Sequence, residues 1–321
     1  MNDSQPQPQP QPETRPTFQD RLQYLSLRLM GLLMGALPRP MALGLAWPLG
    51  VFAFDIVRIR RRVTLENLAQ AFPDRSPAER RRIGRGAFIN LAVVAVEMLR
   101  ARHLTREKVL SLVHMDEESE ALHHRIMKEG KGVVFVGGHY STWELLAARL
   151  AATGYPTLII VQQQRNPLVN RDLAKSRDRL GFHLVDRDKA VRYVLSTLKE
   201  GGVVGILADQ DAGTRFGIFI DFFGRPASTY QGPAGFALRC GAPLVGAWIH
   251  REGISYTAGY RRLDEEALVG LPPDADEETR IRRLTEAYVQ WFEERIRMDP
   301  DQYFWLHRRW KTRPEQQTEK S

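Results

Sequence analysis

Residues 132–146 read GVVFVGGHYSTWELL, and this stretch decides the fold that the rest of the chain predicts. Residues 133–136 form a short β-branched and aromatic run, typical of a strand buried on both faces. The two glycines that follow permit a sharp turn, and apolar residues recur at helical spacing from Thr142 onward. His139 is therefore expected at the carboxyl end of a strand, where open α/β sheets bind their ligands.

The polar residues after the glycines have two interpretations. Glu144 follows His139 by five residues, and a carboxylate so placed can orient an imidazole that removes a proton from a hydroxyl group. The segment from Ser141 to Glu144 also matches a capping box, with Ser141 as the N-cap and Glu144 at the third helical position. Carboxylates are favoured at helix starts in any case, so the spacing alone does not separate a catalytic role from a structural one.

Beyond residue 130 the chain alternates short apolar runs with helical patterns. This alternation predicts an α/β fold, with a mixed, mostly parallel central sheet of βαβ units flanked by helices. The expected strands are 133–136, 157–161, 182–185, 203–207, 218–220 and 244–249. The expected helices are 142–152, 168–180, 189–199, 233–239 and 279–297. An earlier helix should begin after Ser76, with Pro77 first and Glu79 third, and run to about residue 100.

Composition divides the 321 residues into four segments. Residues 1–15 carry a Gln-Pro repeat and are expected to be disordered. Residues 16–62 form a helical anchor, residues 63–314 the α/β domain, and residues 315–321 a flexible tail. The single cysteine, Cys240, excludes a disulfide framework and a zinc–cysteine cluster and fits a reducing compartment.

The anchor segment is the most hydrophobic part of the chain. Residues 22–37 and 41–54 are largely apolar, but neither run reaches the roughly 20 residues that a spanning helix needs. A basic cluster follows at 58–62, suited to anionic headgroups on a cytoplasmic leaflet. These adjoining features favour an anchor that lies in or partly crosses the membrane; the alternative is a helical hairpin packed on the domain.

The net charge of +8 permits three kinds of partner: nucleic acid, an anionic membrane, or an acidic substrate or carrier. No zinc finger, RNA-binding aromatic motif or basic zipper supports the first, so no nucleic acid is expected.

Further polar residues gather at predicted strand ends and in loops. Because the carboxyl ends of parallel strands share one edge, His139, Arg165 and Asp209 are expected to face one crevice. Asp209 and Asp211 lack further ligands at EF-hand spacing, so no metal is expected.

Four segments together carry a family resemblance: GHYSTWE at 138–144, DQDAG at 209–213, FFGRPAST at 222–229 and QYFWLHRR at 302–309. In this order they resemble the lauroyl/myristoyl-type acyltransferases of lipid A biosynthesis. That family lies within the glycerolipid acyltransferase group, which has a histidine–x4–acid signature. The resemblance extends from about residue 20 to residue 314.

The resemblance implies an inner-membrane enzyme, on the cytoplasmic face, that moves a fatty acyl chain to a hydroxyl of a lipid A precursor. The co-substrate would be an acyl thioester of acyl carrier protein or coenzyme A, with no other cofactor. His139 maps to the catalytic histidine and Glu144 to its acid partner. The expected substrate-binding residues are Arg165, Arg177, Asp209, Gln210, Asp211, Ser228, Thr229, Arg308 and Arg309. Alternatives are another lipid acceptor, such as a lysophospholipid, and a non-catalytic protein that binds anionic lipid.

Overall fold

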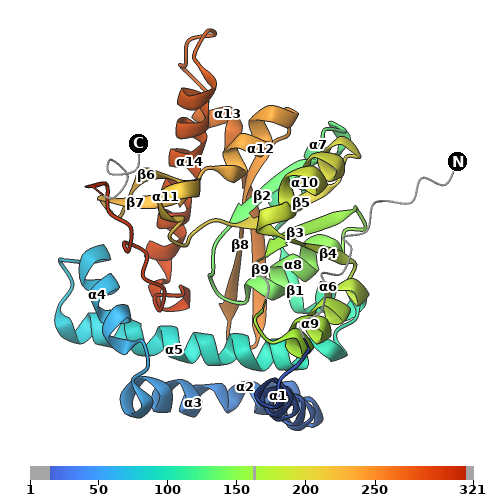
Figure 1. The fold of residues 1–321 in the computed structure, drawn as a ribbon, viewed down its shortest axis with the longest axis vertical. Helices are drawn as coiled ribbons and strands as arrows, with labels where there is room; N and C mark the ends of the chain where they lie inside the picture. Colours follow the sequence, from blue (N-terminus) through green and yellow to red (C-terminus); the bar gives the residue numbers. More distant parts are fainter. Residues whose placement is uncertain (1–14, 162–163, 316–321) are drawn as a thin grey trace, which may run out of the picture.

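The computed structural model describes residues 15–161 and 164–315, and it is built around one seven-stranded sheet (Figure 1). The strand order is β1-β9-β8-β2-β5-β3-β4, and every neighbouring pair is parallel except β8 and β9. The strands of this sheet are β1 (Val113–Met115), β2 (Val133–Gly137), β3 (Thr157–Val161), β4 (Phe182–Asp186), β5 (Val203–Leu207), β8 (Leu244–Glu252) and β9 (Ser255–Arg262). The predicted mixed, mostly parallel sheet is confirmed.

Helices cover both faces of the sheet, as the composition of β2 predicts. Val134 and Val136 pack on one side with residues of three helices, α10 (Ala190–Lys199), α12 (Gly232–Cys240) and α14 (Glu277–Met298). Val133 and Phe135 point to the opposite side and pack with α7 (Glu117–Lys128) and α8 (Trp143–Ala151). The strand is therefore buried on both faces, because side chains alternate along it. Smaller helical elements complete the domain: α4 (Arg61–Ala71), η2 (Ala101–His103), α6 (Arg106–Leu112), α9 (Pro167–Arg179), η3 (Arg187–Lys189), α11 (Gly213–Phe216), α13 (Asp264–Ala267) and η4 (Pro300–Gln302).

Several regions differ from the sequence-based prediction, which also did not include β1 and α7. The strand expected at 218–220 lies outside the central sheet: β6 (Gly217–Phe222) pairs with β7 (Arg225–Tyr230) in an antiparallel hairpin. Phe223 and Gly224, between these two strands, both adopt positive φ and form the two-residue turn that favours a hairpin. Strand β9 was missed because its sequence, SYTAGYRR, lacks an apolar run.

Of the two capping boxes in the sequence, one is confirmed. Helix α5 (Pro77–Arg100) begins at Ser76, whose hydroxyl accepts from the Glu79 backbone while the Glu79 carboxylate accepts from the Ser76 backbone. The second, at Ser141, is wrong: the N-cap of α8 is Thr142, and its side chain makes no capping hydrogen bond. The Ser141 backbone N–H donates to the Gln302 carbonyl at 2.8 Å, and the residue is held at a φ of +48°. This leaves Glu144 available for another partner.

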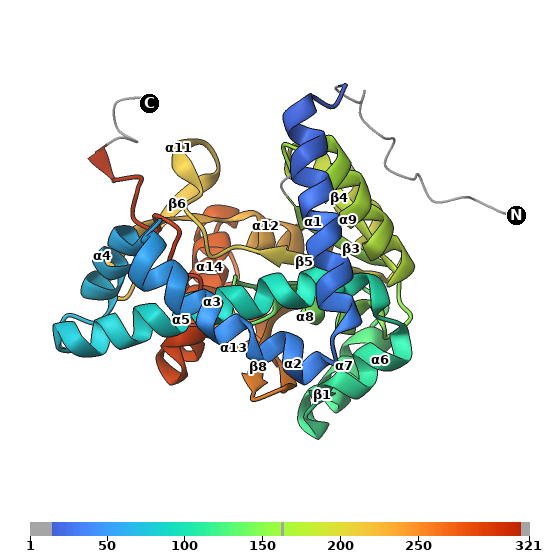
Figure 2. The same cartoon turned by 90° about the horizontal axis from the view of Figure 1, so that it is seen from below.

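The N-terminal helices all contact α5: α2 and α3 run along it, and α1 crosses it (Figures 1 and 2). They are α1 (Phe18–Ala36), α2 (Arg39–Gly44), α3 (Ala46–Phe52) and the π-helical turn η1 (Ala53–Val57). One side is buried: Met34 and Ala46 pack with Val93 of α5. The other side exposes large apolar side chains, Leu22, Leu25, Leu29, Leu32, Leu33, Met41, Trp47, Leu49 and Phe52. Within the described residues, Arg39–Val57 is long and apolar enough to cross a membrane, on length and composition alone.

The domain boundaries drawn from composition stay predictions. Most of the predicted tails, residues 1–14 and 316–321, lie outside the described residues.

Candidate active site

Sheet register brings the central pair of the site together. Strands β2 and β5 are neighbours, with Gly137 opposite Leu207 at their carboxyl ends. His139 and Asp209 each follow two residues later, so their side chains meet: His139 Nδ1 lies 2.8 Å from Asp209 Oδ1. The shared edge expected from the parallel strands therefore places these two residues in contact.

The environment of Asp209 keeps its carboxyl group ionised. Burial raises the pKa of Asp209, but the charge and hydrogen bonds of His139 outweigh that effect and hold the pKa below its usual value. An ionised carboxylate only accepts hydrogen bonds, so His139 donates a hydrogen bond from Nδ1–H to Asp209 in both its charged and its neutral form, and the neutral form carries its one ring proton on Nδ1. This tautomer leaves the lone pair of Nε2 free to accept a proton.

The C-terminal segment fixes the loop that carries His139. The backbone N–H of Phe304 donates to the His139 carbonyl at 3.0 Å, and Tyr140 and Tyr303 form an antiparallel β-bridge. On α5, the Asn90 side chain donates to the Gln302 carbonyl at 3.0 Å. The histidine loop is thus held from the far end of the chain.

Glu144 does not make the hydrogen bond to His139 that the spacing suggested. It lies in the first turn of α8, and both of its oxygens are engaged by Arg177 of α9, with Nε–Oε1 at 2.5 Å and Nη2–Oε2 at 3.0 Å. The position opposite His139 Nδ1 is taken by Asp209. Glu144 and Arg177 nevertheless line the same cavity as His139, as does Gln210, whose Nε2 lies 3.4 Å from His139 Nδ1 and 3.5 Å from His139 Nε2.

Four of the expected substrate-binding residues, Asp211, Ser228, Thr229 and Arg309, make contacts within the protein. Arg309 is 3% exposed; it donates to the Ser228 carbonyl and to Thr229 Oγ1, both at 2.6 Å, and lies over the Phe222 ring. The Asp211 carboxylate accepts hydrogen bonds from the backbone N–H and the hydroxyl group of Thr312. These contacts hold the C-terminal segment against the β6–β7 hairpin and the loop after β5; a role of these four residues in binding substrate stays a prediction.

The two remaining arginines, Arg165 and Arg308, are exposed and lie outside the cavity lining. The crevice expected to hold His139, Arg165 and Asp209 therefore forms without Arg165. Arg165 directly precedes Asn166, which is the N-cap of α9. The Asn166 side chain accepts hydrogen bonds from two backbone N–H groups of α9 and donates to two oxygens of α1.

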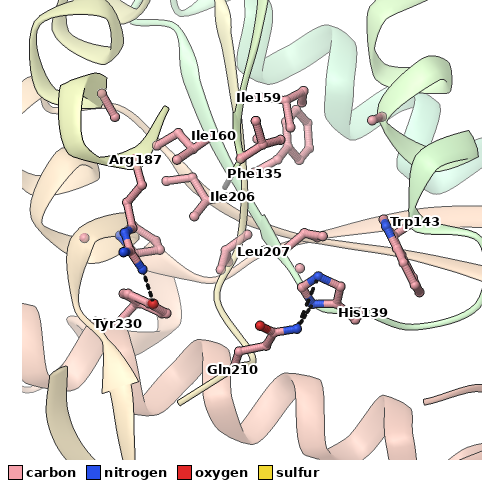
Figure 3. Close-up of a pocket in the computed structure, with 18 of the residues that line it drawn as sticks. Phe135, His139, Trp143, Ile159, Ile160, Arg187, Ile206, Leu207, Gln210 and Tyr230 are labelled. Atoms are coloured by element: carbon pink, nitrogen blue, oxygen red, sulfur yellow. Dashed lines mark hydrogen bonds between the residues drawn. The ribbon is translucent and has the colours of Figure 1, made fainter. Parts of the chain in front are cut away.

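A cavity of about 600 Å³ opens at the carboxyl edge of the sheet, and residues from both faces line it. Figure 3 shows His139, Trp143 and Ile159 on one side of the strand that carries Ile206, and Arg187 and Tyr230 on the other. We call the two parts the α8 lobe and the α10 lobe. The α8 lobe is lined by Phe135, Leu146, Ala147, Leu150, Ile159, Phe182, Gly205 and Leu207. The α10 lobe is lined by Ile160, Arg187, Ala190, Val191, Ile206, Arg215, Phe216, Tyr230 and Phe236.

The sequence did not single out Arg187 or Arg215. A signal was present for Arg187, because it follows a predicted strand just as His139 does, at the same edge of the sheet. Within the described residues, no group of three or more His, Cys, Asp or Glu side chains is arranged to hold a metal ion.

A histidine paired with a buried carboxylate beside an apolar lobe, at the carboxyl edge of a mostly parallel sheet, is typical of the active site of an α/β enzyme. The model of the bacterial lipid A biosynthesis acyltransferase family matches residues 16–312, and the chain belongs to this family. It is therefore an acyltransferase of lipid A biosynthesis, as the sequence motifs predicted.

Several characterised relatives align over most of the chain. The lipid A biosynthesis lauroyltransferase of Escherichia coli (strain K12) is 30% identical over 287 residues, covering 87% of this chain and 88% of that protein. The palmitoleoyltransferase of the same organism is 27% identical over 280 residues, covering 87% of each chain. Its myristoyltransferase is 26% identical over 267 residues, covering 83% of this chain and 79% of that protein. The three names specify different acyl chains, so membership of the family leaves the chain length open.

Proposed function

We propose that this enzyme transfers a fatty acyl chain from a thioester, carried by acyl carrier protein, to a hydroxyl group of a lipid A precursor. His139 acts as the general base, and Asp209 orients its ring. The observation that carries the proposal is the 2.8 Å contact between His139 Nδ1 and Asp209, at the edge of a cavity whose α8 lobe is apolar.

The reaction follows from this geometry in two steps. The acceptor hydroxyl attacks the thioester carbonyl carbon while His139 Nε2 takes its proton, and the carboxylate of Asp209 stabilises the resulting imidazolium. The tetrahedral intermediate then collapses: the C–S bond breaks, the proton passes from Nε2 to the departing sulfur, and an ester and a free thiol remain. The Gln210 amide, beside Nε2, is placed to donate a hydrogen bond to the oxyanion.

Glu144 and Arg177 contribute to binding the acceptor in this proposal, rather than to proton transfer. Their paired charges form a polar section of the cavity wall next to His139, which suits the acceptor sugar better than an acyl chain. The exposed Arg165 and Arg308 are available to anionic groups at the protein surface. No metal or other cofactor takes part.

The α8 lobe is the proposed site of the acyl chain. Its lining is apolar, and it begins beside His139 and Trp143 and extends along the sheet under α8. Gly205, in the middle of β5, has no side chain to fill this space, and the Ile159 side chain leans over it: a Cβ at residue 205 would lie 2.5 Å from Ile159 Cδ1. A larger residue at position 205 must therefore push Ile159 into the lobe.

Gly205→Val should shorten the acyl chain that the enzyme accepts. Each methylene excluded from an apolar site forfeits about 0.8 kcal/mol, so kcat/KM for long-chain thioesters is expected to fall by tenfold or more, while short-chain thioesters keep near-normal values. The measurement is the chain-length profile of acyl transfer from carrier-protein thioesters to a lipid A precursor, followed by mass spectrometry. Ile206→Leu, on the opposite face of the same strand, is the matched control. An unchanged ratio of long- to short-chain rates would place the acyl chain elsewhere.

The same assay tests the proposed function itself. Each turnover should add one acyl group to the precursor and release one thiol. Thiol release without acylation of the precursor, or acylation of a lysophospholipid only, would contradict the assignment of the acceptor.

We further propose that the enzyme works at the cytoplasmic face of the inner membrane, with the exposed side of α1 to α3 in the lipid. The apolar side chains on this side form a surface larger than soluble monomers usually expose. Exposed arginines at 58, 60 and 62 follow directly and suit anionic headgroups. The helices pack along α5, and Met98 of α5 lines the cavity, so the catalytic edge of the sheet lies close to this surface.

Leu29→Glu combined with Leu33→Glu should release the protein from membranes. Both side chains are more than half exposed, and burying a leucine contributes about 1.5–3 kcal/mol. Sedimentation with anionic vesicles is the measurement. Val269→Glu, which alters an exposed apolar residue just after α13, a helix that lies far from α1 in Figure 1, should leave binding unchanged. Full sedimentation of the double variant would show that other residues hold the protein on the membrane.

A further inference from the structure

Two arginines from different elements meet at the rim of the α10 lobe. Arg187 belongs to η3, directly after β4, and Arg215 belongs to α11, directly before the β6–β7 hairpin. The guanidinium carbons lie 5.5 Å and 4.8 Å, respectively, from the centroid of the Phe216 ring. Both side chains are exposed and both line the cavity that holds His139, so they define a positively charged rim on the lobe opposite the acyl chain.

The neighbouring aromatic rings restrict how these charges move. Arg187 also lies over the Tyr230 ring, at 5.8 Å, and its Nη1 donates to the Tyr230 hydroxyl at 2.7 Å (Figure 3). A guanidinium over an aromatic ring is attracted by the negative face of the ring. A guanidinium held by ring contacts and a hydrogen bond loses less conformational freedom when its remaining N–H groups bind a ligand.

Arg215 and Arg177 differ in whether a carboxylate neutralises their charge. Arg177 is neutralised by Glu144 at 2.5 Å. Arg215 has no carboxylate partner in the part of the chain that the structure describes, and it shares the Phe216 ring with a second cation. Arg215 can therefore form a charge-assisted hydrogen bond to an anion that enters the α10 lobe.

We infer that Arg187 and Arg215 form a phosphate-ester site of this enzyme. Two planar guanidinium groups match the several oxygens of a phosphate better than ammonium groups do. The inference rests on the proposed function, because both proposed substrates bring this chemistry to the cavity. The prosthetic arm of an acyl carrier protein contains a phosphodiester, and a lipid A precursor contains sugar phosphates. Both substrates carry a phosphate group, and the experiment below determines which of the two phosphates binds.

Steady-state kinetics with four substrates tests the site. Donors are an acyl-phosphopantetheine thioester and an acyl-N-acetylcysteamine thioester, which lacks the phosphate; acceptors are a lipid A precursor with and without its phosphates. Arg215→Ala and Arg187→Ala should raise KM by about tenfold or more for the substrate whose phosphate is bound, the loss typical of a charge-assisted hydrogen bond. The effect should disappear when that substrate lacks its phosphate. Arg125→Ala, an exposed arginine of α7 outside the cavity lining, changes the net charge equally and is the matched control.

A direct titration separates failure of this site from failure of the proposed reaction. Wild-type protein should bind pantetheine 4′-phosphate or glucosamine 1-phosphate more tightly than the matching compound without phosphate. Arg215→Ala should remove that preference, and Arg125→Ala should keep it. If the wild type prefers neither phosphorylated probe, or if the rim variants match the Arg125→Ala control in both KM and binding, the site is overturned. Absence of acyl transfer with intact phosphate binding would overturn the proposed function alone.

Discussion

His139→Ala is expected to lower kcat for acyl transfer by about 10²–10⁴, because it removes the general base. The nitrogen that accepts the proton, Nε2, has no substitute at that position: the paired carboxylate Asp209 lies on the Nδ1 side of the ring. The KM for the acyl donor should change little, because the apolar α8 lobe stays intact. Single-turnover rates and the melting temperature are the two measurements.

His139→Asn is the control for this prediction. Alanine leaves the buried Asp209 carboxylate without its hydrogen-bond partner, which by itself destabilises the fold. An asparagine amide can still donate to Asp209, but it cannot act as a base. We therefore expect His139→Asn to be as slow as His139→Ala while it unfolds at a higher temperature. Near-wild-type turnover by either variant would contradict the mechanism.

Asp209→Asn is expected to cost nearly as much, a loss in kcat on the order of 10³–10⁴, by analogy with the loss of the orienting carboxylate in serine proteases. The asparagine amide can donate to Nδ1, which moves the ring proton to Nε2 and blocks the position that must accept the acceptor's proton. The imidazolium formed during the reaction also loses its counter-charge. Because the side chain keeps its shape, the melting temperature should change much less than the rate does.

Glu144→Gln is the matched control for Asp209→Asn. It also removes one carboxylate charge beside the cavity without changing side-chain size, but its structural partner is Arg177 rather than His139. We expect its main effect to be a higher KM for the lipid acceptor, with kcat within about tenfold of wild type. A larger loss of kcat in Glu144→Gln than in Asp209→Asn would assign the orienting role to Glu144.

The sequence predicted the parts of the fold that depend on local pattern. The strand after Gly132 and the helix after Ser76 were predicted correctly. A strand buried on both faces and a capping box can each be recognised from a few neighbouring residues. The β6–β7 hairpin was not predicted, because its turn depends on two residues with positive φ, one of them the bulky Phe223. Strand β9 is stabilised by pairing with β8, which a run of polar and small residues does not reveal.

The site was predicted less completely, because its contacts connect distant parts of the chain. The shared edge of a parallel sheet placed His139 and Asp209 together, but the in-register pairing of β2 with β5 was needed to show that they form a hydrogen bond. Spacing along the chain favoured Glu144 instead, and the contact of α9 with Glu144 could not be foreseen from either segment. For Arg309, the sequence shows a cation among aromatic residues but not that its guanidinium is buried on Ser228 and Thr229.

The central claim is that Asp209 holds His139 with the proton on Nδ1 and the Nε2 lone pair toward the cavity. Nitrogen-15 NMR of histidine-labelled protein, with His139 assigned by comparison with His139→Asn, measures this tautomer directly. The account predicts a protonated Nδ1 and an unprotonated Nε2 in neutral His139, a spectrum altered by Asp209→Asn and unaltered by Glu144→Gln. A protonated Nε2, or a spectrum that responds to Glu144→Gln and not to Asp209→Asn, would contradict it.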